Sequence, residues 1–168
     1  SEAMIAAVEG HLGGMTYVVI DVSGSMDNKL AGKSQTARVD AAAGLAILAR
    51  EVSASCRIFT FSQSLVEVPN FRGLALSQSI SASQEHGGTY LRAALDRLKL
   101  ERPQPDRAIV ITDEQAHDGL GPAIADQAYI VNVASYQPGL EIGGGWTRIN
   151  GWSERVIDWI QQDEALEH

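Results

Sequence analysis

Several absent features limit what this 168-residue chain can be. It contains a single cysteine, Cys56, so no internal disulfide can form. Cys56 opens an apolar run, where a buried and unreactive thiol is favoured over a nucleophile. No apolar stretch approaches the ~18 residues that a membrane-spanning helix needs, and no signal peptide is recognisable. These absences favour a cytoplasmic domain that makes no membrane contact.

Positive charge is also scarce. The chain has 13 Lys and Arg residues against 21 Asp and Glu residues, which gives a net charge of −8 at pH 7. An acidic surface repels phosphate groups, so we expect no direct binding of nucleic acid by this chain. Hydrophobic residues make up 45% of the sequence, enough for the core of one ordinary domain.

We therefore predict a single domain over residues 1–168. Within it, residues 1–14 are expected to be a linker or a helix from an upstream domain together with a cloning remnant. Residues 166–168 are expected to be the remnant of an affinity tag.

Apolar runs alternate with helical patterns along the chain. Four β-branched, nearly continuous runs predict central strands of a sheet that is covered on both faces, over residues 16–21, 57–61, 107–112 and 129–133. Helices are predicted over residues 35–53 and 89–100, and an apolar stripe of Val156, Trp159 and Ile160 indicates a C-terminal helix.

Two shorter runs complete the predicted sheet. Residues 64–68 follow the second strand after a two-residue turn, a connection that allows only an antiparallel edge strand. Residues 146–149 are a candidate for the last strand. The fold class is therefore α/β: a doubly wound, mainly parallel sheet with one antiparallel edge strand and helices on both faces, as in Rossmann-like folds.

Oxygen-bearing side chains are predicted at one edge of this sheet. Ligands of an open parallel sheet bind beyond the carboxyl ends of the strands, and five side chains belong there. They are Asp21, Ser23, Ser25, Thr89 and Asp113. Two carboxylates and three hydroxyls are hard ligands that suit Mg2+, and two negative charges leave coordination positions open for water or for an acidic group of a partner.

The order and spacing of these five residues resemble a known family. The stretch Asp21-Val22-Ser23-Gly24-Ser25, then Thr89 after two glycines, then Asp113 after an apolar strand, resembles the D-x-S-x-S…T…D pattern of von Willebrand factor A domains. In that family the five residues form a metal-ion-dependent adhesion site, and all five positions are filled here.

This resemblance implies a binding module that is not an enzyme. Ser23 and Ser25 would contact the metal directly, and the other three residues directly or through water. A carboxylate of a partner would fill the last position. The implied ion is Mg2+, with Mn2+ or Ca2+ as alternatives.

A finer resemblance is to the A domain of bacterial Ro autoantigen (TROVE) proteins. It rests on four segments: RVDAAA at 38–43, HGGTYL at 86–91, ITDEQ at 111–115 and GWSERV at 151–156. Ro proteins join this domain to a ring of helical repeats that binds small structured RNAs. The ring is absent from this chain, so the resemblance implies an RNA-binding parent protein whose RNA site lies outside the chain.

Other interpretations of the same residues are possible. Asp21 and its serines could form a solvated turn. A phosphatase could use Asp21 as nucleophile with Mg2+, but the second acid of such enzymes would fall at Ser23, which is not an acid. A serine hydrolase needs a Ser–His pair, and no G-x-S-x-G elbow is present. His86 is expected to shape the loop before Thr89, and Glu114 either to orient the loops of the site or to face solvent.

Overall fold

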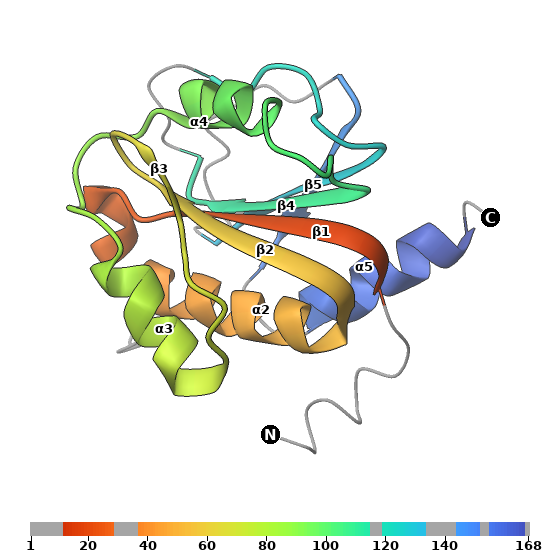
Figure 1. The fold of residues 1–168 in the computed structure, drawn as a ribbon, viewed down its shortest axis with the longest axis horizontal. Helices are drawn as coiled ribbons and strands as arrows, with labels where there is room; N and C mark the ends of the chain where they lie inside the picture. The colour runs from red at the N-terminus through yellow and green to blue at the C-terminus, as the bar shows by residue number, and fades with distance from the viewer. Residues whose placement is uncertain (1–11, 29–36, 115–118, 134–143, 152–154, 167–168) are drawn as a thin grey trace.

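The computed structural model describes residues 12–28, 37–114, 119–133, 144–151 and 155–166. Its centre is a six-stranded sheet with the order β3-β2-β1-β4-β5-β6 (Figure 1). The strands are β1 (Leu12–Asp21), β2 (Ser53–Phe61), β3 (Leu65–Glu67), β4 (Arg107–Thr112), β5 (Gln127–Asn132) and β6 (Trp146–Asn150). Only the β2–β3 pair is antiparallel, and β3 is an edge strand.

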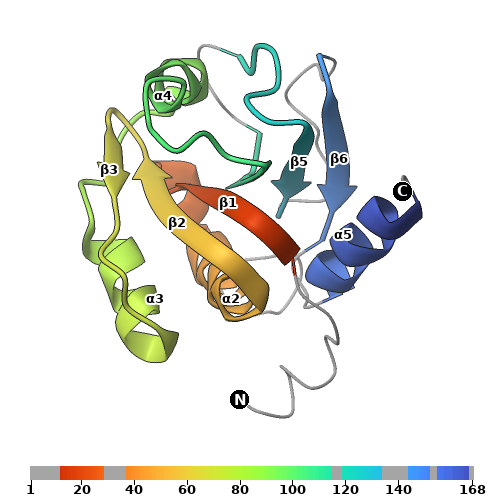
Figure 2. The ribbon, with the colours of Figure 1, turned by 45° about the vertical axis from the view of Figure 1, so that its right-hand side comes forward.

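Helices cover both faces of the sheet. They are the short 3-10 helix η1 (Gly24–Asp27) and the α-helices α2 (Arg38–Val52), α3 (Gly73–Ala82), α4 (Leu91–Leu98) and α5 (Arg155–Leu166). Helices α2, α3 and α5 lie against one face, and α4 lies against the other (Figures 1 and 2).

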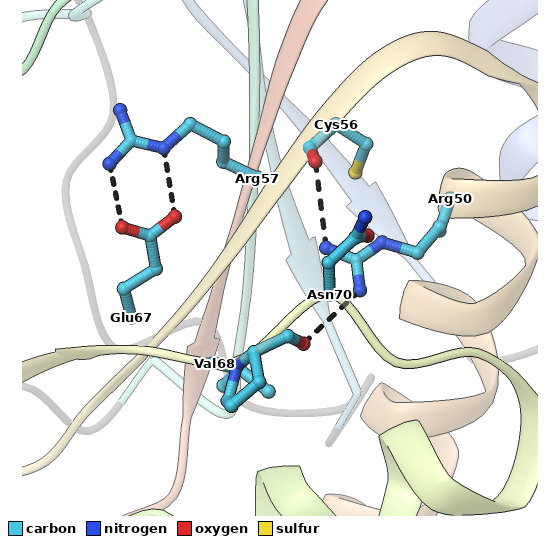
Figure 3. Close-up of a pocket in the computed structure, with 7 residues that line it drawn as sticks. Arg50, Cys56, Arg57, Glu67, Val68 and Asn70 are labelled. Atoms are coloured by element: carbon cyan, nitrogen blue, oxygen red, sulfur yellow. Dashed lines mark hydrogen bonds and ion pairs between the residues drawn. The ribbon is translucent and has the colours of Figure 1, made fainter.

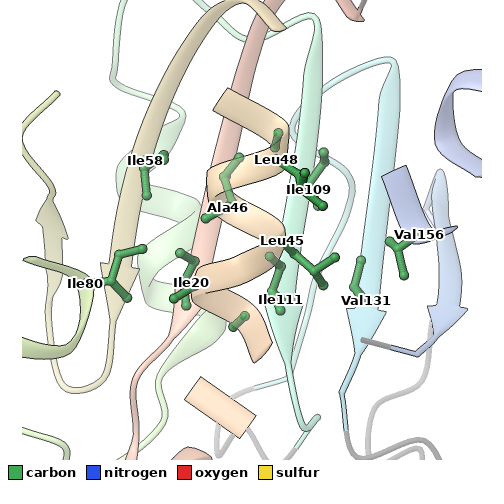
Figure 4. Close-up of a cluster of buried hydrophobic side chains, with 14 of the residues drawn as sticks. Ile20, Leu45, Ala46, Leu48, Ile58, Ile80, Ile109, Ile111, Val131 and Val156 are labelled. Atoms are coloured by element: carbon green, nitrogen blue, oxygen red, sulfur yellow. The ribbon is translucent and has the colours of Figure 1, made fainter. Parts of the chain in front are cut away.

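Successive residues of the central strands point to opposite faces and so feed two separate cores. In β1, Val18 and Ile20 join the core beneath α2, whereas Tyr17 and Val19 join the core beneath α4. Figure 4 shows the first core, in which Leu45 of α2 lies over the central strands. Burial on both faces explains why the central strands read as continuous apolar runs.

The structure confirms the predicted fold class and the antiparallel edge strand. It also confirms a last strand, which runs as β6 from Trp146 to Asn150. Helix α2 begins at Arg38, and residues 35–36 of the predicted helix lie outside the described residues.

Two features differ from the predictions. Strand β1 begins at Leu12, so residues 12–14 lie in the sheet and are not part of a linker. The register shifts between Leu12 and Met15, and Gly14 has a φ of 72°, which interrupts the apolar pattern from which a strand is recognised. The second difference is helix α3, which the sequence analysis did not predict. Residues 1–11 and 167–168 lie outside the described residues.

Candidate functional site

Asp21 and the turn after β1 form the centre of the candidate site. The buried Asp21 carboxylate accepts hydrogen bonds at Oδ1 from the Ser23 backbone N–H (2.8 Å) and the Ser23 hydroxyl (2.5 Å). The hydroxyls of Ser23 and Ser25 are 3.4 Å apart. Helix η1 begins at Gly24, directly after Ser23. The structure thus links three of the five predicted residues, with Ser23 in contact with both Asp21 and Ser25.

Asp113 reaches the same edge from the neighbouring strand. Strands β1 and β4 are paired in parallel, with Ile20 opposite Ile111, so Asp113 follows β4 at the edge of the sheet where Asp21 ends β1. Asp113 is fully buried, and its Oδ2 accepts a hydrogen bond from Nη1 of Arg38 at 3.0 Å. The same nitrogen donates to the Ser25 carbonyl at 3.4 Å. Arg38 therefore joins Asp113 to the η1 turn.

Thr89 is held beside η1 by its own backbone segment. Thr89 is buried, and the N–H of Gly24 donates to the Gly87 carbonyl at 3.0 Å. On its other side the segment is fixed by Ser62, whose hydroxyl accepts from the Gly87 N–H and donates to the Gly88 carbonyl, both at 2.8 Å. A Cβ atom at Gly87 would lie only 3.2 Å from the Gln63 side chain, so this position favours glycine.

His86 connects the loop before Thr89 to η1 and to α3, in agreement with the prediction that it shapes this loop. Its Nδ1 lies 2.8 Å from Oδ1 of Asp27 in η1, and its Nε2 lies 2.8 Å from the Ser81 carbonyl. Burial lowers the pKa of His86, but the hydrogen bonds with Ser81 and Asp27 outweigh this effect and raise it above its ordinary value. Because both partners are acceptors, the geometry suits a protonated imidazolium that donates from both nitrogens. His117, the other histidine near this edge of the sheet in the sequence, lies outside the described residues.

The electrostatics of the site favour a cation. Burial, with a smaller contribution from nearby Asp113, raises the pKa of Asp21 to about 6, although the hydrogen bonds from Ser23 and Thr112 lower it. An ionised carboxylate in this position is costly unless a positive charge compensates it. Among the described residues there is no group of three or more His, Cys, Asp and Glu side chains that could hold a metal. Any ion here must therefore use the hydroxyls, and this all-oxygen set fits Mg2+, Mn2+ or Ca2+.

Arg38 was not predicted as part of the site. A charged residue at the start of an alanine-rich helix is a usable signal, because a charge that becomes buried with the helix requires a partner. The sequence does not identify that partner, since Asp113 is 75 positions away.

A separate cavity of about 430 Å³ is lined by Cys56 and Arg57 of β2, Arg50 of α2 and residues 67–70 (Figure 3). Arg57 lines it and forms a two-bonded ion pair with Glu67, while Arg50 donates to the carbonyl of Phe71 at 2.7 Å. Burial raises the pKa of the partly buried Cys56 thiol to about 11, so little thiolate forms at neutral pH, as predicted from the sequence. Arg57 and Arg50 thus connect β2 and α2 to β3 and to the segment that follows β3.

Comparisons with known proteins agree with the fold of this chain. The family model for the von Willebrand factor type A domain matches residues 16–115. No curated protein sequence matches the chain. None of the helices in the described part of the chain is both long and apolar enough to cross a bilayer.

Solved structures with a similar fold come from several organisms. The Ro protein (RSR) of Deinococcus radiodurans has a TM-score of 0.68 and 17% identity; the match covers 90% of this chain and 34% of that protein. An aerotolerance-related membrane protein of Bacteroides fragilis has a TM-score of 0.65 and 16% identity, and the match covers 93% of this chain and 100% of that one. Manganese-loaded TRAP protein of Plasmodium vivax has a TM-score of 0.51 and 14% identity, with 90% and 72% covered. At these identities the likeness concerns the fold.

Proposed function

Since this chain belongs to the von Willebrand factor type A domain family, we propose that it is a non-enzymatic binding module that works through a divalent metal ion. The ion is Mg2+, with Mn2+ or Ca2+ as alternatives, and the residues that hold it are Asp21, Ser23, Ser25, Thr89 and Asp113. The partner supplies an acidic group, from a protein or another ligand, to the position that the chain leaves open.

The observation that carries this proposal is the convergence of Asp21 with the hydroxyls of Ser23 and Ser25, beside a second buried carboxylate. A solvated turn would leave these groups exposed, whereas Asp21, Ser23 and Asp113 are buried. Manganese in the TRAP structure, which has a similar fold, adds support for a divalent ion at such a site.

The bound ion would supply positive charge to which a partner's carboxylate binds. The residues of this chain keep that charge available, because the hydroxyls of Ser23, Ser25 and Thr89 coordinate without adding negative charge. The packed backbone around Gly24 and Gly87 fixes the hydroxyls in place. Asp21 and Asp113 together carry no more negative charge than the ion carries positive charge, so a rigid site of this kind does not repel a partner's carboxylate from the open coordination position.

We further propose that the chain is the A domain of a Ro-type protein. The support is the sequence resemblance together with the fold shared with the Deinococcus Ro protein, of which the chain spans about a third of the length. Binding of small structured RNA would belong to the ring of the parent protein, and the acidic chain would contribute protein contacts.

The metal site is tested by thermal unfolding with Mg2+ and with chelator. At a free Mg2+ concentration 100-fold above the dissociation constant, the wild-type protein should gain about 2.7 kcal/mol of stability. Asp21→Ala should gain none, because it removes the central carboxylate. Asp40→Ala, which removes an equal charge from an exposed position in the first turn of α2, should respond like the wild type. Equal unfolding temperatures with Mg2+ and with chelator in all three proteins would refute the site.

The phosphatase alternative makes an opposite prediction. An enzyme that used Asp21 as nucleophile would hydrolyse a generic phosphate ester, such as p-nitrophenyl phosphate, in the presence of Mg2+. We expect no turnover above the Asp21→Ala background, because Ser23 stands where the general acid is required and cannot donate a proton at neutral pH. A release of p-nitrophenol that depends on Asp21 would establish the enzyme.

A further inference from the structure

Glu114 has a backbone conformation that is rare for a residue with a side chain, and it directly follows a proposed metal ligand. It comes after Asp113, is fully buried, and has a φ of 62°. This left-handed region is occupied most easily by glycine. A strained backbone that carries a buried carboxylate persists only where its surroundings hold it in place.

Two side chains from the neighbouring strands hold the Glu114 carboxylate. Arg148 of β6 donates from Nε to Oε2 at 2.8 Å and from Nη2 to Oε1 at 2.6 Å. Asn132, the last residue of β5, donates from Nδ2 to Oε2 at 2.9 Å. A two-bonded arginine–carboxylate pair is among the most restrictive arrangements available to side chains. Strands β5 and β6 lie side by side and carry none of the proposed ligands (Figure 2).

The main chain of Glu114 continues these contacts to Asp21. The Glu114 N–H donates to the Thr112 hydroxyl at 3.0 Å, and this hydroxyl donates to Oδ2 of Asp21 at 2.7 Å. A series of hydrogen bonds therefore runs from Arg148 in the middle of β6 through Glu114 and Thr112 to Asp21 at the carboxyl end of β1. Both proposed carboxylate ligands are connected to this series. Asp21 accepts its last hydrogen bond, and Asp113 is joined to Glu114 by the peptide bond.

We propose that Glu114 is a positioning residue, which Arg148 and Asn132 anchor so that Asp113 and Asp21 present their carboxylates in fixed directions. This inference rests on the proposed metal site. Residues that hydrogen-bond to the surroundings of metal ligands fix the orientation of the ligands, so that less conformational entropy is lost when the ion binds. If Glu114 only joined β4 to β6, its loss would lower stability and leave metal affinity unchanged.

The deciding comparison is between Arg148→Met and Arg57→Met. Arg57 forms the same two-bonded pair with Glu67, at 2.9 and 2.7 Å, at the other side of the sheet. The two arginine side chains are also similarly exposed, 21% for Arg148 and 22% for Arg57. We expect Arg148→Met to weaken Mg2+ binding by about 10-fold or more in titration calorimetry, and Arg57→Met to leave it unchanged. Equal Mg2+ affinities of the two variants would overturn the inference.

A second measurement needs no metal. In chelator, the backbone amide of Glu114 should exchange its hydrogen faster in Arg148→Met than in the wild type, and at the wild-type rate in Arg57→Met. If the wild-type protein does not bind Mg2+ but this amide responds, the proposed function fails and the positioning network stands. If Mg2+ binds but the amide does not respond, the network fails and the proposed function stands.

The variant Glu114→Gly distinguishes the effect of the strained backbone from the effect of the side-chain contact with Arg148. Glycine adopts a φ of 62° without strain but cannot bind Arg148. We expect this variant to lose Mg2+ affinity to a similar extent as Arg148→Met, because the anchor is missing. Wild-type affinity in Glu114→Gly would mean that the backbone conformation alone matters, and would overturn the role of the side chain.

Discussion

Arg38→Met should lower the free energy of unfolding of the metal-free protein by about 3–5 kcal/mol, the usual cost of breaking a buried ion pair. Both partners are buried, with 7% of the Arg38 side chain and none of the Asp113 side chain exposed. Methionine retains most of the apolar stem but removes the charge that compensates Asp113. Chemical unfolding in chelator measures this effect directly.

The same substitution should increase the stabilisation by Mg2+. In the wild-type protein the Arg38 guanidinium is hydrogen-bonded to Asp113. The positive charge of Arg38 repels the metal ion, and its hydrogen bond competes with the ion for the Asp113 carboxylate. Without Arg38, both Asp21 and Asp113 depend on the ion for their compensation. We therefore expect a larger rise of the unfolding temperature with Mg2+ in Arg38→Met than in the wild type.

The matched control for this prediction is Arg72→Met. Arg72 pairs with Glu51 at 3.2 Å, but 68% of its side chain is exposed, and exposed pairs contribute about 0–1 kcal/mol. Arg72→Met should change the free energy of unfolding by no more than this amount. It should leave the stabilisation by Mg2+ unchanged. A Mg2+ response of Arg38→Met no larger than that of the wild type would mean that Arg38 does not compete with the ion.

Arg38 also marks the limit of what the sequence predicts about the site. The five proposed oxygen ligands could be selected from the sequence, because three lie in a five-residue motif and the others follow recognisable signals, a glycine pair and the end of an apolar strand. The arginines were not. Each of 13 basic residues could pair with any of 21 acidic ones, and only the folded chain decides. Arg38 and Asp113 meet across 75 positions, and Arg148 and Glu114 across 34.

The fold was also predictable only where the sequence pattern of a single segment is sufficient, and not where packing between distant segments decides the structure. The central strands were predicted because burial on both faces makes them continuously apolar. Helix α3 was missed because its helical signal is short: only Leu76 and Ile80 have the i, i+4 spacing of a buried helix face, and the residues between them are two serines and a glutamine. Packing of Leu76 and Ile80 in the core beneath α2 decides its structure.

Leu76→Ala tests that packing and should cost about 2–5 kcal/mol of unfolding free energy, because Leu76 is fully buried and its truncation leaves a cavity. Leu74→Ala is the control in the same helix. Leu74 is 73% exposed, and leucine and alanine are both good helix formers, so its loss should change stability by no more than about 0.5 kcal/mol. Urea unfolding measures both values.

These two variants also separate the stability of the fold from that of the site. Neither residue contacts the proposed ligands through the hydrogen bonds described above, so Mg2+ should add the same free energy to Leu76→Ala as to the wild type. Equal losses in Leu74→Ala and Leu76→Ala would mean that α3 does not pack on the sheet through Leu76. A large loss confined to Leu76→Ala, with the Mg2+ response retained, would establish that α3 supports the core while the metal is held by the strand ends and the loops that follow them.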